Sequence, residues 1–289
     1  MAKEGNVKLV VTFTDYVFEN AITGNLIFLF ERGWKGQTSY FHFNSEYELS
    51  KIEVRENKVI SKIKKDTVSL KKITTIYKGM VIKDRDTVLF EEKKNNKNDF
   101  LLRKNISKWK IISKYYTNYD NLQIIGGTKK LIKHNQVPRI LIRRTGDALC
   151  CAYLEKPSLT ESTLYSCWSN SQKFSNKFLI GLLNSNILDY YNKILFITNR
   201  QGFPQILMTD LEQLPIKQTS TTEQEPFADL VNQILSITKS EDYAVNPQKQ
   251  AKVKVHEEEI DQLVYKIYDL TPEEIKIVEG KDENRNRRN

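Results

Sequence analysis

The sequence lacks the features of a membrane or secreted protein. No apolar run approaches the roughly 18 residues that a membrane span needs. The start, Met1 to Asn6, has no basic segment leading into an apolar core, so no secretory signal is expected. The only cysteines are Cys150, Cys151 and Cys167, and they form no Cys-x-x-Cys pair. We therefore expect a cytoplasmic protein without membrane contact, whose cysteines are small buried apolar residues.

The sequence also lacks the residue patterns of several enzyme classes. The segment 125–130, with two glycines and two lysines, does not complete a nucleotide-binding phosphate loop. The three histidines, His42, His134 and His256, have no ligand-type neighbours at metal-site spacing. Glu91-Glu92-Lys93 has no partner aspartate on a preceding strand, so a nuclease site is not indicated. No Pro-Pro pair occurs, which excludes the Asn/Asp-Pro-Pro-aromatic motif of amino methyltransferases. We predict no catalytic residue and no metal site.

Positive charge is concentrated in one segment. The net charge is +9, yet residues 101–144 alone contain eleven lysines and arginines and one acid, Asp120. Residues 222–279 reverse the balance, with thirteen acids and six lysines. This distribution predicts a basic surface that faces a polyanion and an acidic segment that supports it.

Aromatic residues lie among the lysines of the basic segment, at Trp109, Tyr115, Tyr116 and Tyr119. Lysine neutralises phosphates, arginine pairs with guanine through two hydrogen bonds, and aromatic rings stack on exposed bases. The combination favours nucleic-acid binding. A lysine-rich protein with tyrosines in its core is the alternative explanation.

The basic segment ends in a predicted β-hairpin over residues 138–154. Two apolar runs flank the turn Thr145-Gly146-Asp147. Arg143 and Arg144 precede the turn, and neighbouring side chains of a strand point to opposite faces. We therefore expect different environments for the two arginines, with at least one reaching solvent or a ligand.

The remaining patterns predict strands first and helices later. Strand patterns cover residues 7–13, 25–31, 73–77, 88–90, 100–102, 109–112 and 163–168. Apolar residues at helical spacing predict one helix from Phe178 to Ile194, capped by Ser175. Two capping boxes, Thr222 with Glu225 and Thr271 with Glu274, predict further helix starts, and His256 fits a solvated start.

Four motifs occur in an order that resembles a known family. They are Pro138–Asp147, the helix Phe178–Asn186 with Leu188–Tyr191, Gly202–Ile206 and Asp210–Ile216. Together they resemble the TaqI-like C-terminal specificity domain of adenine-N6 DNA methyltransferases, including type IIG restriction-modification enzymes. The ending, Ile260–Ile275, is similar to the usual end of those proteins.

Weaker similarity extends upstream. Tyr77–Met80 and Lys104–Trp109 resemble two further elements of the family, although the first lacks the family's Thr-Gly and the second has Asn105 in place of an aspartate. The segment 18–31 is similar to the last hairpin of the methyltransferase domain.

The resemblance implies an α+β fold, in which a β-rich DNA target-recognition domain precedes a C-terminal helical bundle. We expect a methyltransferase remnant at 1–36, a linker at 37–69, the specificity domain at 70–216, helices at 217–280 and a disordered tail at 281–289. The implied function is sequence-specific binding of double-stranded DNA. The resemblance assigns S-adenosylmethionine and catalysis to another half, which is either missing or supplied by another chain.

The expected DNA contacts fall in two groups. Base or phosphate contacts are assigned to the hairpin corner and to the loop after the long helix. Lysines and one tryptophan of the basic segment are expected to bind the backbone or stack on bases. The full set is Arg143, Arg144, Thr145, Arg200, Gln201, Lys83, Lys104, Lys108, Trp109, Lys110, Lys129 and Lys130. Two alternatives stay open: a single-stranded DNA or RNA binder, and an interaction subunit of a methyltransferase complex.

Overall fold

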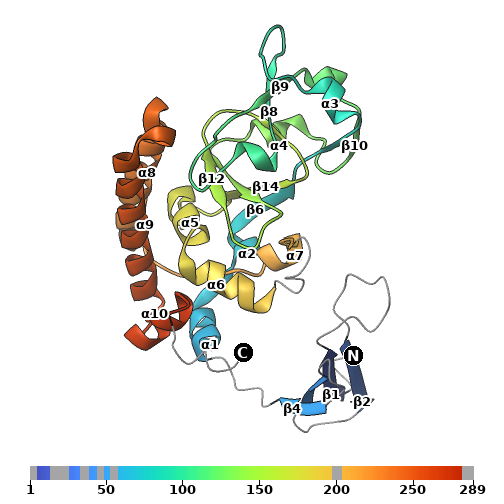
Figure 1. Ribbon diagram of the computed structural model, residues 1–289, viewed down its shortest axis with the longest axis vertical. Helices are drawn as coiled ribbons and strands as arrows, with labels where there is room; N and C mark the ends of the chain where they lie inside the picture. Colours follow the sequence, from blue (N-terminus) through green and yellow to red (C-terminus); the bar gives the residue numbers. More distant parts are fainter. Residues whose placement is uncertain are drawn as a thin grey trace. The chain divides into compact units, whose positions relative to one another are not determined.

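The computed structural model describes residues 5–13, 26–32, 39–43, 49–52, 58–196 and 204–281. The chain divides into two compact units (Figure 1). The first consists of Met1–Lys58 with Thr198–Pro204, and the second of Val59–Ile197 with Gln205–Asn289. Each unit is described by itself.

The first unit contains a four-stranded sheet in the order β2-β1-β3-β4. Its strands are β1 (Gly5–Phe13), β2 (Leu26–Arg32), β3 (Ser39–Phe43) and β4 (Leu49–Ile52). The two predicted strands, β1 and β2, pair antiparallel and are confirmed. The expected linker differs from the prediction, because β3 pairs in parallel with the free edge of β1 and β4 then pairs with β3. The strand-bearing unit therefore extends beyond residue 36.

The second unit is built on an antiparallel sheet in the order β12-β11-β14-β6. Its strands are β6 (Thr74–Lys78), β11 (Arg139–Arg143), β12 (Cys151–Leu154) and β14 (Leu164–Ser169). The alternation of β11 places Ile140 and Ile142 in the main core and Leu141 in a second cluster with Leu101 and Ile106. The sheet is therefore covered on both faces at its centre, and the predicted hairpin is confirmed.

Short strands surround this sheet. They are β5 (Thr67–Ser69), β7 (Val81–Ile82), β8 (Asn98–Leu101), β9 (Tyr115–Thr117), β10 (Ile124–Gly126), β13 (Leu159–Thr160) and β15 (Pro215–Lys217). Short helices connect them: α2 (Leu70–Ile73), α3 (Arg85–Val88), η1 (Arg103–Asn105), η2 (Tyr119–Asn121) and α4 (Leu131–Asn135). The strands expected at 88–90 and 109–112 are reduced to isolated bridges at Phe90, Trp109 and Ile111.

The predicted helix over 178–194 is two helices, α5 (Asn176–Leu183) and α6 (Asn186–Leu195). Ser175 caps α5 as expected, and Ser185 starts α6 by accepting a hydrogen bond from the Leu188 amide. Between the helices, the Asn184 side chain bonds both the amide and the carbonyl of Cys151, each at 3.0 Å. The helix is interrupted at this tertiary contact although the apolar stripe continues. The stripe therefore predicted the buried face but not the interruption.

The C-terminal part is helical, with α7 (Met208–Leu211), α8 (Thr221–Thr238), η3 (Glu241–Val245), α9 (Pro247–Ile267) and α10 (Pro272–Val278). In Figure 1, α8 and α9 run side by side. The Thr271–Glu274 capping box is confirmed, whereas α8 starts two residues earlier than expected, with Ser220 and Glu223. The prediction for His256 is wrong, because this residue lies inside α9 and is buried.

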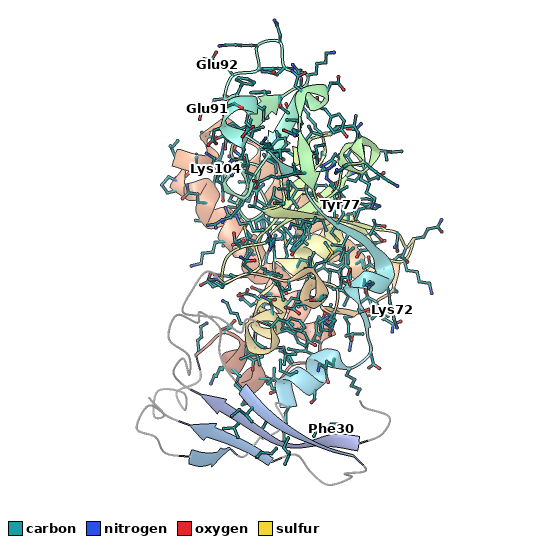
Figure 2. All side chains as sticks on the ribbon, turned by 90° about the vertical axis from the view of Figure 1, so that its right-hand side faces the viewer. Phe30, Lys72, Tyr77, Glu91, Glu92 and Lys104 are labelled. Carbon is teal, nitrogen blue, oxygen red and sulfur yellow. The ribbon has the colours of Figure 1, made fainter. Side chains whose placement is uncertain are left out.

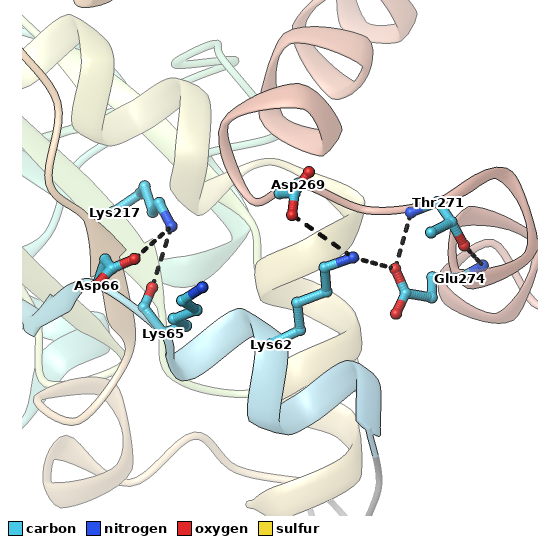
Figure 3. A network of polar contacts seen from close by, with 7 residues as sticks. All are labelled: Lys62, Lys65, Asp66, Lys217, Asp269, Thr271 and Glu274. Carbon is cyan, nitrogen blue, oxygen red and sulfur yellow. Dashed lines mark hydrogen bonds and ion pairs between the residues drawn. The ribbon is translucent and has the colours of Figure 1, made fainter.

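Lysine contacts hold α1 (Lys58–Lys64) and the segment after it to the C-terminal helices and to β15 (Figure 3). The Lys62 ammonium lies 2.9 Å from the Glu274 carboxylate and 3.8 Å from that of Asp269. The Lys217 ammonium donates to the Lys65 carbonyl at 3.1 Å. The two ends of the second unit are therefore tied together.

Candidate nucleic-acid interface

The hairpin corner separates the two neighbouring arginines. The Arg143 guanidinium turns inward and donates to the Ile106 carbonyl, and its buried Nε has no partner within the described part of the chain. Arg144 points the other way, where its Nη2 donates to Gln205 Oε1 at 2.9 Å in an exposed contact. Backbone bonds from the Arg144 amide to the Thr163 carbonyl and from the Ile206 amide to the Arg144 carbonyl fix the corner. The predicted difference between the arginines is confirmed.

A third arginine, Arg103, joins this corner from η1. Its Nη1 donates to the Thr145 hydroxyl at 2.8 Å, and its backbone amide donates to the Thr163 hydroxyl at 3.1 Å. The Thr163 hydroxyl in turn donates to the Glu161 carboxylate at 2.6 Å. We call the surface formed by Arg103, Arg144, Thr145, Thr163 and Gln205 the corner cluster.

The corner cluster borders a cleft of about 480 Å³. Arg103, Lys104, Tyr115 and Glu161 contribute to its walls. The Lys104 ammonium lies 4.8 Å from the Tyr115 ring centroid, a cation–π distance, and the lysine remains exposed. Figure 2 labels Lys104 beside Glu91, which is another wall residue. Three cationic side chains and three carboxylates therefore line the cleft beside an aromatic ring.

Three of the predicted lysines lie around the small ladder formed by β7 and β10. Lys83 follows β7, and its amide donates to the Gln123 carbonyl at 3.0 Å. Lys129 and Lys130 follow the other end of the ladder, and all three lysines are exposed. Gly127 has a φ of +71°, and a Cβ there would lie 2.1 Å from the Gly79 carbonyl oxygen. The chain thus requires glycine at this crossing to bring the lysines to the ladder.

The predicted residues Lys108, Trp109 and Lys110 face the C-terminal helices. The Lys108 ammonium lies 3.1 Å from the Glu257 carboxylate, and Lys110 lies 5.0 Å from the Tyr243 ring centroid. Trp109 is 3% exposed, and its indole donates to Glu257 at 2.6 Å. The expected stacking of Trp109 on a base is therefore wrong, because the core and α9 cover the ring. We call these three residues the helix-facing segment.

Arg139, counted among the basic residues, is fully buried. Its guanidinium donates to the carbonyls of His134, Gln136 and Ser158, so it fastens the end of α4 to the sheet. Burial lowers the pKa of His134 to about 4, so the ring is neutral at pH 7. Its Nε2 then donates to the Thr128 carbonyl at 2.9 Å. Both residues support the loop that carries Lys129 and Lys130.

Other expectations concern residues or features outside this surface. Arg200 and Gln201, and the expected tail beyond Lys281, lie outside the described residues. Within the described ranges, no cluster of three or more His, Cys, Asp or Glu residues has metal-binding geometry. Cys151 and Cys167 are buried, and burial raises the pKa of the Cys167 thiol to about 12. No helix in the described part is long and apolar enough to cross a membrane.

Sequence reasoning missed three members of the corner cluster, Arg103, Thr163 and Gln205, and the neighbouring Glu161. Arg103 directly precedes Lys104 in a motif of the family resemblance, so a sequence signal existed for it. Thr163 and Glu161 reach the cluster only because β14 pairs with β11. Gln205 reaches it through a bridge with Thr145.

Comparisons with known proteins agree with this fold. Residues 99–216 match the family model of the TaqI-like C-terminal specificity domain. A similar solved structure is the type IIL restriction-modification enzyme MmeI in complex with DNA, with a TM-score of 0.56 and 11% identity. This match covers 95% of the present chain and 45% of the MmeI chain, so the chain spans less than half the length of that enzyme.

A second solved structure is the HsdS subunit from Thermoanaerobacter tengcongensis, with 12% identity over 73% of this chain and 49% of that one. Its TM-score of 0.39 is too low to bear on the fold. No curated protein matches the sequence. The family match and the order of the motifs agree, so residues 99–216 are similar to the TaqI-like C-terminal specificity domain, and the fold is similar to that of MmeI.

Proposed function

We propose that the chain recognises a specific sequence in double-stranded DNA. It would act as the target-recognition part of a restriction-modification enzyme, either an adenine-N6 DNA methyltransferase or a type IIG enzyme. The observation that carries the proposal is the corner cluster, where Arg103 and Arg144 hydrogen-bond to neutral side chains and, among the described residues, to no carboxylate. Their charge therefore stays available to DNA.

The geometry supports different roles for different residues of this surface, with base contacts from some and phosphate contacts from others. Arg144 and Gln205 form an exposed pair, and both residue types bind base edges through two hydrogen bonds. The exposed lysines Lys83, Lys104, Lys129 and Lys130 suit phosphates, because an ammonium is a point charge without the planar fork of arginine. Reading and anchoring thus belong to different residues.

Methylation would need a catalytic half that holds S-adenosylmethionine, since residues 1–289 contain no Asn/Asp-Pro-Pro-aromatic motif. The partial coverage of MmeI supports such a half. The first unit offers a docking surface, because Ile27 and Leu29 on β2 are 59% and 50% exposed. A methyltransferase chain or domain would cover these side chains.

The test is duplex binding as a function of salt, followed by selection from a pool of randomised duplexes. We expect log affinity to fall linearly with log salt, with a slope of about −0.9 per neutralised phosphate. We also expect the selected pool to converge on one sequence. A flat salt response, or a pool that stays random, would contradict the proposal.

The burial of Trp109 weighs against single-strand binding, because a stacking platform needs exposed rings. Tyr115, Tyr116 and Tyr119 are only partly exposed. Competition between a duplex and its separate strands decides between the two modes. Stronger binding to the separate strands would favour the single-strand alternative.

A further inference from the structure

Arg103 has a backbone that is fixed on both sides. The Thr163 hydroxyl accepts a hydrogen bond from its amide at 3.1 Å. The preceding residue, Leu102, donates from its amide to the Asn105 side chain at 2.8 Å, which closes η1 around Arg103. The Thr163 hydroxyl is itself oriented by Glu161, which also accepts from Arg85 at 3.3 Å. The start of the Arg103 side chain is therefore set before any ligand arrives.

The guanidinium of Arg103 is held but not neutralised. One of its five N–H donors is used, in the 2.8 Å bond to the Thr145 hydroxyl. The described ion pairs include none with Arg103, whereas Arg85 on the same cleft contacts both Asp86 and Glu161. Arg103 is also exposed. A planar fork of donors is thus presented to solvent at little remaining cost in side-chain entropy.

Guanine matches such a fork, because its major-groove edge presents two acceptors, O6 and N7, in one plane. A phosphate needs only positive charge, which the nearby Lys104 already supplies. From this arrangement we propose that Arg103 is a specificity-determining residue that reads a guanine, and that Thr145 is its positioning residue. The inference rests on the proposed function, because it assumes that the corner cluster faces duplex DNA.

Thr145 suits positioning more than direct contact. Its hydroxyl oxygen already accepts from Arg103, and its backbone bridges to Gln205 beside Arg144. It also precedes Gly146, whose φ of +136° turns the chain away from the strand. Thr145 therefore connects Arg103 and Arg144, the two arginines of the corner cluster, and sets the spacing between them.

The experiment uses the full 289-residue chain and a randomised duplex pool, with sequencing of the bound fraction. Arg103→Lys keeps the charge and removes the fork. We expect it to abolish the preference for guanine at one position, a loss of tenfold or more in discrimination, with an unchanged salt slope. Arg85→Lys is the matched control on the same cleft, and because lysine keeps the positive charge that pairs with Glu161, we expect the preference to stay intact.

Thr145 is tested with two variants. Thr145→Val removes the hydroxyl and keeps the shape, so discrimination at the same position should fall at least threefold, while Thr145→Ser restores it. Thermal unfolding of each variant reports on folding. A merely structural role would lower stability without changing base preference.

The outcomes separate the two levels of the argument. If Arg103→Lys weakens all sequences equally, or changes nothing, Arg103 does not read a base and this inference fails, while the proposed function stands. If the wild-type chain shows no sequence preference, both fail. Loss of guanine preference in Arg103→Lys but not in Arg85→Lys supports the inference.

Discussion

The cations of the corner cluster and of the helix-facing segment come from the same basic stretch, residues 101–144, yet they have opposite kinds of partner. Arg103 and Arg144 hydrogen-bond to neutral groups, and Arg103 remains exposed while Arg144 is partly exposed. Lys108 pairs with Glu257, and Lys110 lies over Tyr243. The local charge density of a sequence therefore does not identify a DNA surface. The partner of each cation decides whether its charge is available.

The largest expected effect is a loss of stability from a substitution in the helix-facing segment. Trp109→Ala removes a buried indole and its bond to Glu257, so the free energy of unfolding should fall by about 3–5 kcal/mol. Urea denaturation measures the loss. DNA affinity per folded molecule should hardly change, and a selective loss of DNA binding in a stable Trp109→Ala protein would show that the indole contacts DNA after all.

A second effect concerns His134, which supports the loop that carries the exposed Lys129 and Lys130. The pKa of His134 falls from 6.5 to about 4 on folding, so the unfolded chain takes up this proton first as pH falls. This contribution to stability is complete above pH 6.5, declines as pH falls toward 4, and amounts to at most about 3.5 kcal/mol at about 1.4 kcal/mol per pKa unit. Denaturation from pH 7 to pH 4 checks it.

The matched control for this pH effect is His134→Gln, which cannot titrate. Asp261 acts in the opposite direction, because burial raises its pKa to about 6 and the folded state then holds a proton more tightly. The difference between wild type and His134→Gln removes this common contribution. Parallel stability curves for the two proteins would contradict the role of His134.

The two adjacent arginines give the next comparison. Arg144→Ala should reduce discrimination between DNA sequences about tenfold and change stability by no more than about 0.5 kcal/mol. Arg143→Ala removes the contact to the Ile106 carbonyl and should cost about 1–3 kcal/mol of stability. Pool selection and urea denaturation of both variants measure the two quantities. An exchange of these two results would reverse the assignment of the inward and outward arginine.

The smallest effect separates two lysines of one segment. Lys104→Met should weaken binding to all duplexes and reduce the steepness of the salt dependence by about 0.9, the value for one phosphate. Lys108→Met should leave the slope unchanged, because Glu257 already neutralises Lys108. Equal slopes for the two variants would contradict the distinction between the cleft beside the corner cluster, which Lys104 lines, and the helix-facing segment.

Local patterns predicted local structure well. The hairpin around Thr145–Asp147 and the caps at Ser175 and Thr271 depend on neighbouring residues, and the structure confirms them. The break before Ser185 depends on Asn184 reaching Cys151, 33 residues away. No periodicity contains that information.

The candidate site was predictable as a region but not as a set of side chains. Arg139 and Arg144 are both arginines of the same hairpin. Only the fold shows that the Arg139 guanidinium donates its hydrogen bonds to backbone carbonyls, whereas Arg144 donates to the Gln205 side chain. Trp109 was predicted to stack on a base, but its ring lies in the core. Whether such a side chain is buried or available to DNA depends on its tertiary partners, which lie far away in sequence.

Cys151 illustrates a different consequence of such tertiary contacts. It lies on β12, which ends the order of the central sheet. Its carbonyl accepts hydrogen bonds from the Trp109 amide and the Asn184 side chain, and its amide donates to Asn184. An open sheet edge invites pairing with another polypeptide and hence aggregation. Asn184 and Trp109 occupy the positions that an incoming strand would need at Cys151, and so protect the edge against self-association.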